Sequence, residues 1–274
     1  MKEDILTQII ANKRKEISRQ TEAVSMKQLE AIIAMRETRE PLSLSRSVMS
    51  SPTGIISEFK RRSPSKGWIN READVRLITG GYAEAGAAGL SVLTDTDFFG
   101  GSEGDLLKAR LSAPSTPILR KDFIISEYQI LQSAAIQADA ILLIAAALEK
   151  DECRRLAEMA HSLGLEVLLE VHSEDELEYA TDCIDLIGVN NRNLGSFHTD
   201  VENSFRLAER LPKGIPHISE SGISGAETII KLRQAGYNGF LMGESFMKTE
   251  NPAIALRTHI EDLEKASKRL TATA

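Results

Sequence analysis

An acidic and a basic residue lie at the end of a short apolar run at positions 54–58, and their spacing suits acid–base chemistry. The run ends in Glu58, Lys60 follows two residues later, and a loop rich in Ser, Pro and Gly occupies positions 61–67. Residues i and i+2 of a strand project to the same side, so we expect Glu58 and Lys60 to be neighbours at a strand's C-terminal end. Because burying either charge alone costs several kcal/mol, each needs a partner there. An ordinary ion pair at the rim of a sheet would explain this stretch equally well on its own.

Other apolar runs also end in polar side chains. Lys121 ends the run 117–121, Glu170 ends 165–170, and Asn190 ends 184–190 with Arg192 two residues later. The run 215–219 leads into Ser219-Glu220-Ser221-Gly222. A single charge at a strand end is usually solvated, and an arginine there can simply hold a loop. Several lysines and glutamates at one rim would shift one another's pKa values, which is typical of a functional site.

These residues share a rim if the apolar runs form one parallel sheet. Eight runs lie at 54–58, 89–94, 117–121, 139–144, 165–170, 184–190, 215–219 and 239–242. Amphipathic segments follow them at 71–87, 105–112, 127–137, 150–162, 174–180, 201–211, 226–235 and 252–268. Apolar strands alternating with helices predict an α/β protein, a closed (β/α)8 TIM barrel whose strand C-termini form the working face. An open, doubly wound sheet is the alternative.

The first 50 residues precede this pattern. Apolar residues at helical spacing predict two amphipathic helices between positions 4 and 36, and the polar stretch 35–51 is predicted to be irregular. We therefore expect residues 1–274 to form a single barrel domain, with residues 1–50 as an N-terminal helical extension.

The composition narrows the classes of partner. The chain has 274 residues and a net charge of −7, which argues against nucleic acid as the main partner. The longest apolar run, 140–148, is too short to cross a bilayer, so no membrane association is expected. The two cysteines, Cys153 and Cys183, match neither a metal site nor a disulfide framework, which favours a reduced, cytoplasmic protein.

Two glycine-containing loops predict a phosphate site. Residues 220–225 follow the seventh run, and residues 242–245 follow the eighth run and precede a short helical segment at 246–248. Glycines allow backbone N–H groups to approach an anion closely, and a helix N-terminus favours negative charge. Phosphate sites of TIM barrels commonly lie at these two loops. Lys60 is long enough to reach the same anion, and two ordinary glycine turns are the alternative.

The motifs, taken in order, resemble the indole-3-glycerol-phosphate synthase family over essentially the whole chain. They comprise Lys13–Glu16, Glu58–Gly67, Leu93–Ser102, Leu119–Phe123, Leu169–Val171, Gly188–Leu194, Glu220–Ile223 and Met242–Ser245. Phe59 and Arg62 depart from the smaller residues common in the family, but neither is an expected catalytic position. The resemblance implies ring closure of 1-(2-carboxyphenylamino)-1-deoxyribulose 5-phosphate with loss of CO2 and water, in tryptophan biosynthesis, without a metal or an organic cofactor.

The resemblance also implies roles for individual residues. Lys121 would be the general acid, with a pKa that we expect Lys60 and a partly dry cavity to lower towards neutrality. Glu58 and Glu170 would stabilise positive charge on the anilino nitrogen and transfer protons during dehydration. Asn190 and Ser221 would orient hydroxyl and carboxylate groups, and Arg192 and Ser63 would bind the substrate carboxylate. The phosphate would be bound by Gly222, Gly243, Ser245 and Lys60. The aromatic ring would pack against Phe99, Phe123 and Leu142. Which glutamate and which lysine act in each transfer stays open.

Two other functions are compatible with these residues. A Schiff-base aldolase would use Lys121 as its nucleophile, and a non-enzymatic barrel would bind phosphate as a scaffold. His172, His198 and His217 are too scattered for a metal site and are interpreted as structural. The loop 61–67 is predicted to act as a lid, and the protein is expected to be a monomer for which other tryptophan-pathway enzymes are candidate partners.

Overall fold

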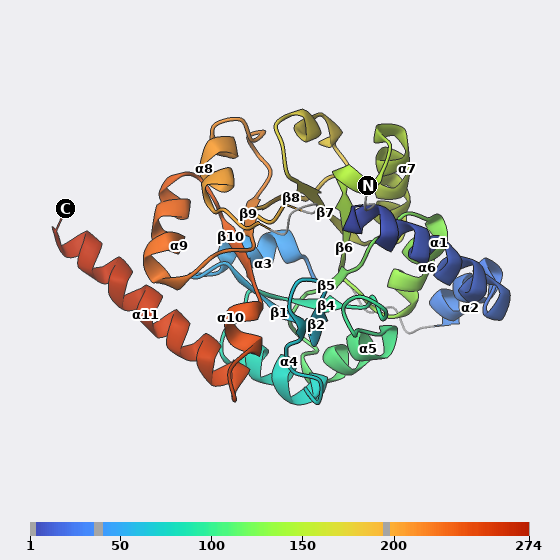
Figure 1. Ribbon diagram of the computed structural model, residues 1–274, viewed down its shortest axis with the longest axis horizontal. Helices are drawn as coiled ribbons and strands as arrows, with labels where there is room; N and C mark the ends of the chain where they lie inside the picture. The colour runs from blue at the N-terminus through green and yellow to red at the C-terminus, as the bar shows by residue number, and fades with distance from the viewer. Residues whose placement is uncertain (1–3, 36–40, 194–197, 274) are drawn as a thin grey trace.

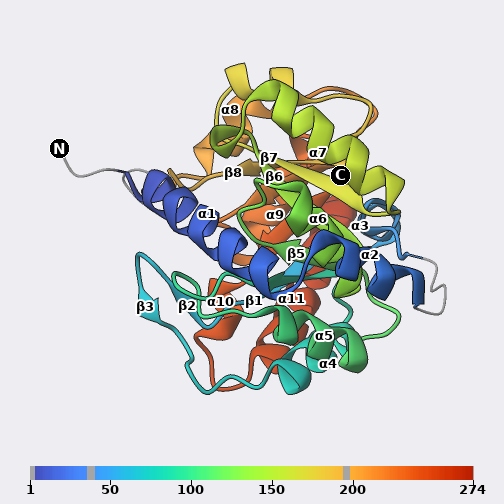
Figure 2. The same cartoon turned by 90° about the vertical axis from the view of Figure 1, so that its right-hand side faces the viewer.

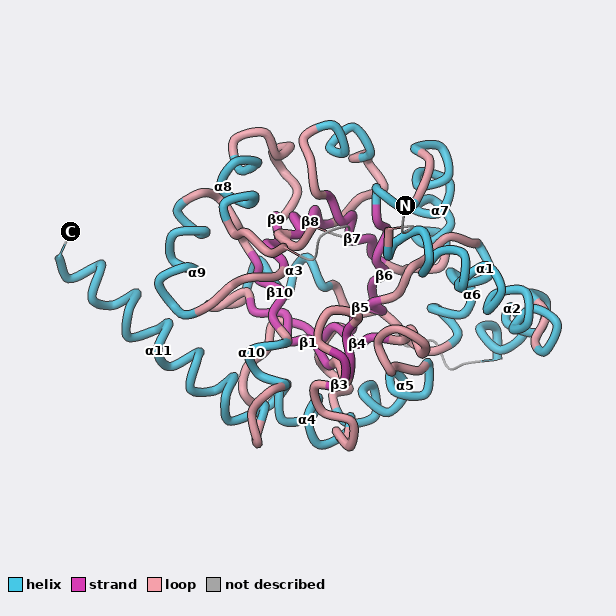
Figure 3. Tube along the Cα trace, viewed as in Figure 1, coloured by secondary structure: helices cyan, strands magenta, loops and turns pink. Residues whose placement is uncertain are grey.

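The computed structural model describes residues 4–35, 41–193 and 198–273, and eight parallel strands close into a barrel within them (Figures 1 and 3). The strands are β1 (Ile55–Phe59), β4 (Gly89–Leu93), β5 (Ile118–Lys121), β6 (Ala140–Ile144), β7 (Glu166–Val171), β8 (Leu186–Asn190), β9 (His217–Glu220) and β10 (Gly239–Met242). Strand β1 pairs with both β4 and β10. This pairing closes the sheet and excludes the open-sheet alternative, so the predicted (β/α)8 barrel is confirmed.

Helices surround the strands (Figure 1). They are α4 (Val75–Glu84), α5 (Glu103–Ser112), α6 (Glu127–Ala135), α7 (Lys150–Ser162), α8 (Glu202–Ala208), α9 (Gly225–Gln234), the short α10 (Glu244–Met247) and α11 (Pro252–Thr273). The helix predicted at 174–180 is instead a 3-10 helix, η2 (Asp175–Tyr179). The short connection between β7 and β8 explains this difference, since 3-10 geometry is used in short pieces. A second 3-10 turn, η1 (Ala145–Ala147), follows β6.

Alternate strand residues form two apolar layers. Ile56, Leu119 and Leu168 belong to an inner cluster, whereas their neighbours in sequence, such as Ile55 and Ile118, pack in the outer cluster under the helices. Successive strand residues point to opposite faces, so positions two residues beyond an inner residue also face the barrel axis. This rule directs the side chains at the strand C-termini into the barrel mouth.

The N-terminal region contains α1 (Ile5–Ala23), α2 (Met26–Met35) and a third helix, α3 (Leu44–Ser50). The prediction that segment 35–51 is irregular is therefore wrong for its second half. Residues 36–40 of this segment lie outside the described residues. Ser43 Oγ caps α3 by accepting a hydrogen bond from the backbone N–H of Arg46 at 3.1 Å. Leu44 and Val48 are buried in the inner cluster. Burial of this short apolar stripe stabilises a serine-rich helix that has little local signal.

Helix α3 lies at the opposite end of the barrel from a hairpin in the predicted lid (Figure 2). The hairpin pairs β2 (Arg62–Ser63) with β3 (Gly67–Trp68). Its base is held by Arg61, whose guanidinium contacts the two Asp105 oxygens at 2.7 and 3.0 Å. Among the described helices, none combines the length and apolar composition that crossing a bilayer requires.

Candidate active site

A cavity of about 540 Å³ opens at the C-terminal ends of the strands. Every residue assigned to catalysis or substrate binding from the sequence lines it: Glu58, Lys60, Ser63, Phe99, Lys121, Phe123, Leu142, Glu170, Asn190, Arg192, Ser221, Gly222, Gly243 and Ser245. Ile5 and Ile9 of α1 line it as well, so the N-terminal extension contributes to the mouth. Most of these residues come from strand ends and the loops beyond them, where the barrel directs side chains inward.

Lys121 is held between two carboxylates at the centre of the cavity. Its Nζ lies 2.7 Å from Glu170 Oε2 and 2.8 Å from Glu220 Oε2. Asn190 Nδ2 donates a hydrogen bond to the other oxygen of Glu170 at 3.0 Å. The side chains of Glu170 and Glu220 are only 3% and 2% exposed, so water screens this cluster little.

Glu220 is the main residue of the cluster for which the sequence predicted no catalytic role, since it stood only among the polar residues at strand ends and at the start of a phosphate loop. The alternation along β9 carried the signal: Ile218 faces the inner cluster, so Glu220 two residues later faces the axis. Gly188 on β8 provides the space for it. A Cβ at position 188 would lie 2.1 Å from Glu220 Oε1, which is far closer than atoms can approach.

The pKa values of the residues in this cluster are shifted in different directions. Burial opposes the charge of Lys121, but Glu170, Glu220 and Glu58 outweigh it and raise the pKa of Lys121. The predicted lowering towards neutrality is therefore wrong, because the two carboxylates contact the ammonium directly. Burial also opposes ionisation of Glu170, yet Lys121 and His172 lower its pKa to about 2. Burial, together with the charge of Glu170, raises the pKa of Glu220 to about 7 despite Lys121.

Glu58 and Lys60 form the predicted ion pair, with Glu58 Oε1 accepting from Lys60 Nζ. Their side chains are 6% and 16% exposed. The backbone of Gly243 packs against Glu58, since a Cβ at position 243 would lie 2.7 Å from Glu58 Cβ. Lys60 is thus close to one of the loops proposed for phosphate, while its charge is paired with Glu58.

The end of β9 adopts an unusual backbone conformation at Ser221, whose φ is +67°. Such left-handed geometry is costly for a residue with a Cβ and needs support from its surroundings. Asn191 supplies it by donating Nδ2 to the Ser221 carbonyl at 3.0 Å. Asn191 is in turn fixed by the backbone N–H of Ser204, which donates to Asn191 Oδ1 at 3.0 Å. This network directs Ser221 into the cavity.

Arg192 connects two loops across the mouth. Its Nη1 donates to Ser65 Oγ at 2.9 Å, and its Nη2 lies 3.4 Å from Glu244 Oε2. Lys66 also lies 3.4 Å from Glu244, at Oε1. The Leu194 end of the Gly188–Leu194 motif is outside the described residues. Arg192 therefore joins the predicted lid to the start of α10, directly after β10.

An aromatic pair forms the apolar wall of the cavity. The rings of Phe99 and Phe123 lie 5.9 Å apart at an interplanar angle of 37°. Leu142, which is 2% exposed, belongs to the same apolar cluster. These side chains offer a flat apolar surface beside the charged centre.

A buried network anchors α1 next to the charged centre. Lys13, which is 1% exposed, lies 2.9 Å from Glu16, 2.9 Å from Asp95 and 3.0 Å from Asp122. Asp122 follows Lys121 directly and accepts a hydrogen bond from Thr94 Oγ1 at 2.6 Å. This network could not be predicted from the sequence, because Asp95 and Asp122 are remote from Lys13 along the chain. Within the described residues, no group of three or more His, Cys, Asp or Glu side chains is arranged to hold a metal ion.

The barrel, the inward-facing lysine with its carboxylates and the glycine-containing loops define an acid–base enzyme of the TIM-barrel class. The model of the indole-3-glycerol phosphate synthase family matches residues 6–259. The chain is 54% identical over 261 residues to an indole-3-glycerol phosphate synthase of Bacteroides thetaiotaomicron, covering 95% of this chain and 99% of that protein. It is 43% identical to one of Polaromonas naphthalenivorans, covering 92% and 97%. The chain belongs to the indole-3-glycerol phosphate synthase family.

Solved structures with much lower identity share the fold. A thiamine phosphate pyrophosphorylase from Pyrococcus furiosus aligns with a TM-score of 0.59 at 15% identity, over 81% of this chain and 98% of that chain. A 3-hexulose-6-phosphate synthase from Salmonella typhimurium aligns with a TM-score of 0.61 at 10% identity, over 77% and 99%. These similarities concern the fold alone.

Proposed function

We propose that this protein converts 1-(2-carboxyphenylamino)-1-deoxyribulose 5-phosphate to indole-3-glycerol phosphate, with loss of CO2 and water. Membership of the family supports the reaction. The observation that carries the proposal is the Lys121 ammonium held between Glu170 and Glu220 in a cavity with an aromatic wall. This arrangement supplies a proton donor and proton acceptors within one site, as the reaction requires.

Lys121 acts as the general acid in the ring closure. The anilino ring carbon attacks the ribulose carbonyl carbon, and Lys121 donates a proton to the carbonyl oxygen as negative charge develops there. The raised pKa of Lys121 keeps it protonated at neutral pH, so the donor form is always present. The oxygen becomes basic enough to take the proton only as the new bond forms.

Carboxylates stabilise the cation that ring closure creates. Positive charge on the anilino nitrogen is favoured by Glu170 and Glu58, and it draws the electrons of the carboxyl bond back into the ring as CO2 leaves. Dehydration then needs an acid for the departing hydroxyl and a base for a proton on carbon. Glu220, whose pKa of about 7 permits both forms near neutral pH, suits an exchange of this kind.

Two sets of groups hold the two charged ends of the substrate. Arg192 and Ser63 bind the carboxylate, and the loops of Gly222, Gly243 and Ser245 bind the phosphate together with Lys60. The remaining contacts are Asn190 and Ser221 with hydroxyl groups and Phe99, Phe123 and Leu142 with the aromatic ring. Fixing both ends of a flexible molecule brings the ring carbon to the carbonyl, and such positioning lowers the barrier by several kcal/mol.

We also propose a cellular location and an oligomeric state for the protein. The free cysteines Cys153 and Cys183 are consistent with a reduced, cytoplasmic location. We propose a monomer of one barrel domain, residues 1–274, with 1–50 as its N-terminal extension. Other enzymes of tryptophan biosynthesis are the candidate partners.

A direct assay tests the function. Purified protein is mixed with the carboxyphenylamino sugar phosphate, and indole absorbance or fluorescence is followed before and after treatment with a chelator. We expect activity in both samples, and a loss of about 10²-fold or more in Lys121→Ala and Glu170→Gln. Borohydride trapping of a sugar phosphate on Lys121 would instead support the Schiff-base aldolase. An inactive wild-type protein would support the scaffold function.

A further inference from the structure

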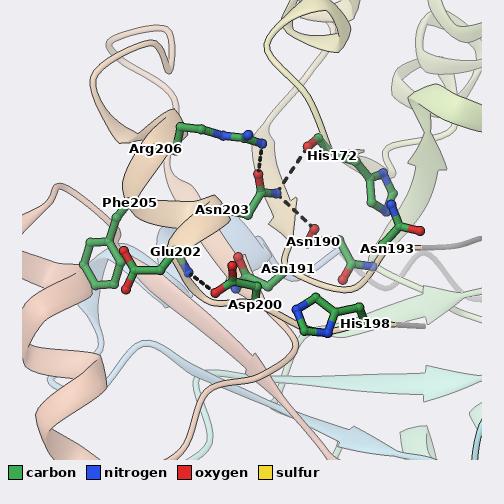
Figure 4. Close-up of a pocket in the computed structure, with 10 residues that line it drawn as sticks. All are labelled: His172, Asn190, Asn191, Asn193, His198, Asp200, Glu202, Asn203, Phe205 and Arg206. Atoms are coloured by element: carbon green, nitrogen blue, oxygen red, sulfur yellow. Dashed lines mark hydrogen bonds between the residues drawn. The ribbon is translucent and has the colours of Figure 1, made fainter. Parts of the chain in front are cut away.

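A histidine lies between the active-site cavity and a second cavity. His172 follows β7 directly, and its side chain is 16% exposed. It lines a polar cavity of about 460 Å³ beside α8 (Figure 4). Glu170 lines the active-site cavity, and Asn190 lines both cavities. Glu170 and His172 therefore connect the charged centre to a separate polar space.

Both ring nitrogens of His172 face carboxylates. Nε2 lies 3.6 Å from Glu170 Oε1, and Nδ1 lies 3.6 Å from Glu176 Oε2. Two hydrogen bonds fix the backbone of His172. Its backbone N–H donates to Glu176 Oε2 at 2.6 Å, and its backbone carbonyl accepts from Asn203 Nδ2 at 3.2 Å (Figure 4). Small movements would convert the 3.6 Å contacts into hydrogen bonds, since catalytic contacts often tighten when substrate binds.

The proposed reaction consumes a proton. Ring closure places one proton on the carbonyl oxygen, and dehydration places a second on the departing hydroxyl. Aromatisation releases one proton from carbon, while CO2 leaves from an ionised carboxylate and carries none. Each turnover therefore takes up one proton from solvent, and the acid group must be recharged inside a largely buried cluster.

We propose that His172 delivers this proton to Glu170 from the second cavity, and that Glu170 passes a proton to Lys121. The proposal rests on the proposed function. The Nε2–H bond of His172 breaks as an O–H bond forms on Glu170, and the carboxyl group then gives a proton to the neutral Lys121 amine. His172 regains its proton from solvent. Glu176 orients the ring so that Nε2 faces Glu170.

The charges around the histidine favour this direction. Burial lowers the pKa of His172, but Glu176, Glu170 and Glu220 raise it overall, so the imidazolium form is available. Once Lys121 has lost its proton, the charge that keeps Glu170 ionised is absent, and Glu170 becomes a better acceptor. The other charged or titratable side chains that line the second cavity are His198, Asp200, Glu202 and Arg206.

The experiment compares His172→Asn and His172→Gln with the wild type across pH. We expect kcat to fall about ten-fold near neutral pH, with a larger deficit at higher pH where free protons are scarcer, and with KM little changed. Added imidazole should restore kcat in proportion to its concentration. Glu176→Gln should lower kcat a few-fold, because the ring loses its orienting partner.

His161→Asn is the matched control, because His161 forms an exposed pair with Asp185 at 2.8 Å, away from the site. It should retain the wild-type pH profile and should not respond to imidazole. A wild-type kcat in both His172 variants would overturn the proposal. So would an equal loss at all pH values without imidazole rescue, which would indicate a purely structural histidine. An inactive wild-type enzyme would instead refute the proposed function.

Discussion

The ammonium of Lys121 lies 2.8 Å from a carboxylate oxygen of Glu220, a residue 99 positions further along the chain. Together with Glu170 at 2.7 Å, this contact makes Lys121 a buried cation with two anionic partners. Such a cluster is stable only when complete, because a buried charge without a partner costs several kcal/mol. Catalysis and stability therefore depend on the same side chains.

Lys121→Met should remove activity and stability together. Loss of the acid should lower kcat by about 10²- to 10⁴-fold. The two carboxylates left behind should lower the free energy of unfolding by about 3–5 kcal/mol, measured by urea denaturation at pH 7. Lys150→Met is the control, because Lys150 is half exposed and lies 3.4 Å from Glu178. It should cost less than about 1 kcal/mol. Equal stability of the two variants would contradict the proposed cost of unpaired buried carboxylates.

Glu220→Gln should change how stability depends on pH. The pKa of Glu220 is about 7 in the fold against 4.5 for an unperturbed glutamate, so the native state binds more protons between these values. Glu220 therefore makes the protein less stable as pH rises through this window. The variant lacks this loss. Its free energy of unfolding should therefore rise relative to that of the wild type by about 1.4 kcal/mol for each pH unit from pH 4.5 to 7. Parallel stability curves for wild type and variant would refute the raised pKa.

Glu170→Gln should change the pH dependence of stability in the opposite direction to Glu220→Gln. The pKa of Glu170 is lowered to about 2, so its contribution is present above pH 4.5 and is lost as pH falls towards 2. The wild type should therefore exceed the variant most at neutral pH, and the gap should narrow in acid. Urea unfolding at pH 3 and pH 7 measures both values. A gap that widens in acid would show that the assignment of the two glutamates is reversed.

Lys13→Met should loosen the N-terminal extension. It removes the cation from Asp95 and Asp122, which are 0% and 2% exposed, and should cost about 3–5 kcal/mol. Activity should also fall, because Asp122 adjoins Lys121 and α1 carries Ile5 and Ile9 of the cavity wall. Lys15→Met, on the exposed side of the same helix, should leave both quantities unchanged. Hydrogen exchange of α1 amides would report the loosening directly.

Gly188→Ala should displace Glu220 from the lysine. The added Cβ would lie 2.1 Å from Glu220 Oε1, so the carboxylate must move. We expect kcat to fall by at least ten-fold, about 1.4 kcal/mol in the barrier, while the fold is retained. Gly104→Ala is the control, since its nearest neighbour would be Ser102 Oγ at 3.6 Å. Alanine at this helical position should be neutral or slightly stabilising.

The sequence alone predicted the fold class and the side chains that line the cavity. Apolar runs and helices alternate along the chain, and strand parity directs Glu58, Lys121 and Glu170 to one mouth, because these patterns follow from local backbone geometry. Helix α3 was missed because its seven serine-rich residues have little local signal and are held by burial of Leu44 and Val48.

Only the tertiary structure decided how the charges interact. The pKa of Lys121 is raised rather than lowered, since Glu220 approaches it from a strand that is remote in sequence and Gly188 leaves the space for that approach. The burial of Lys13 against Asp95 and Asp122 was equally hidden. Local spacing predicts where a side chain points, whereas electrostatic energy depends on distances and burial that arise only when the barrel closes.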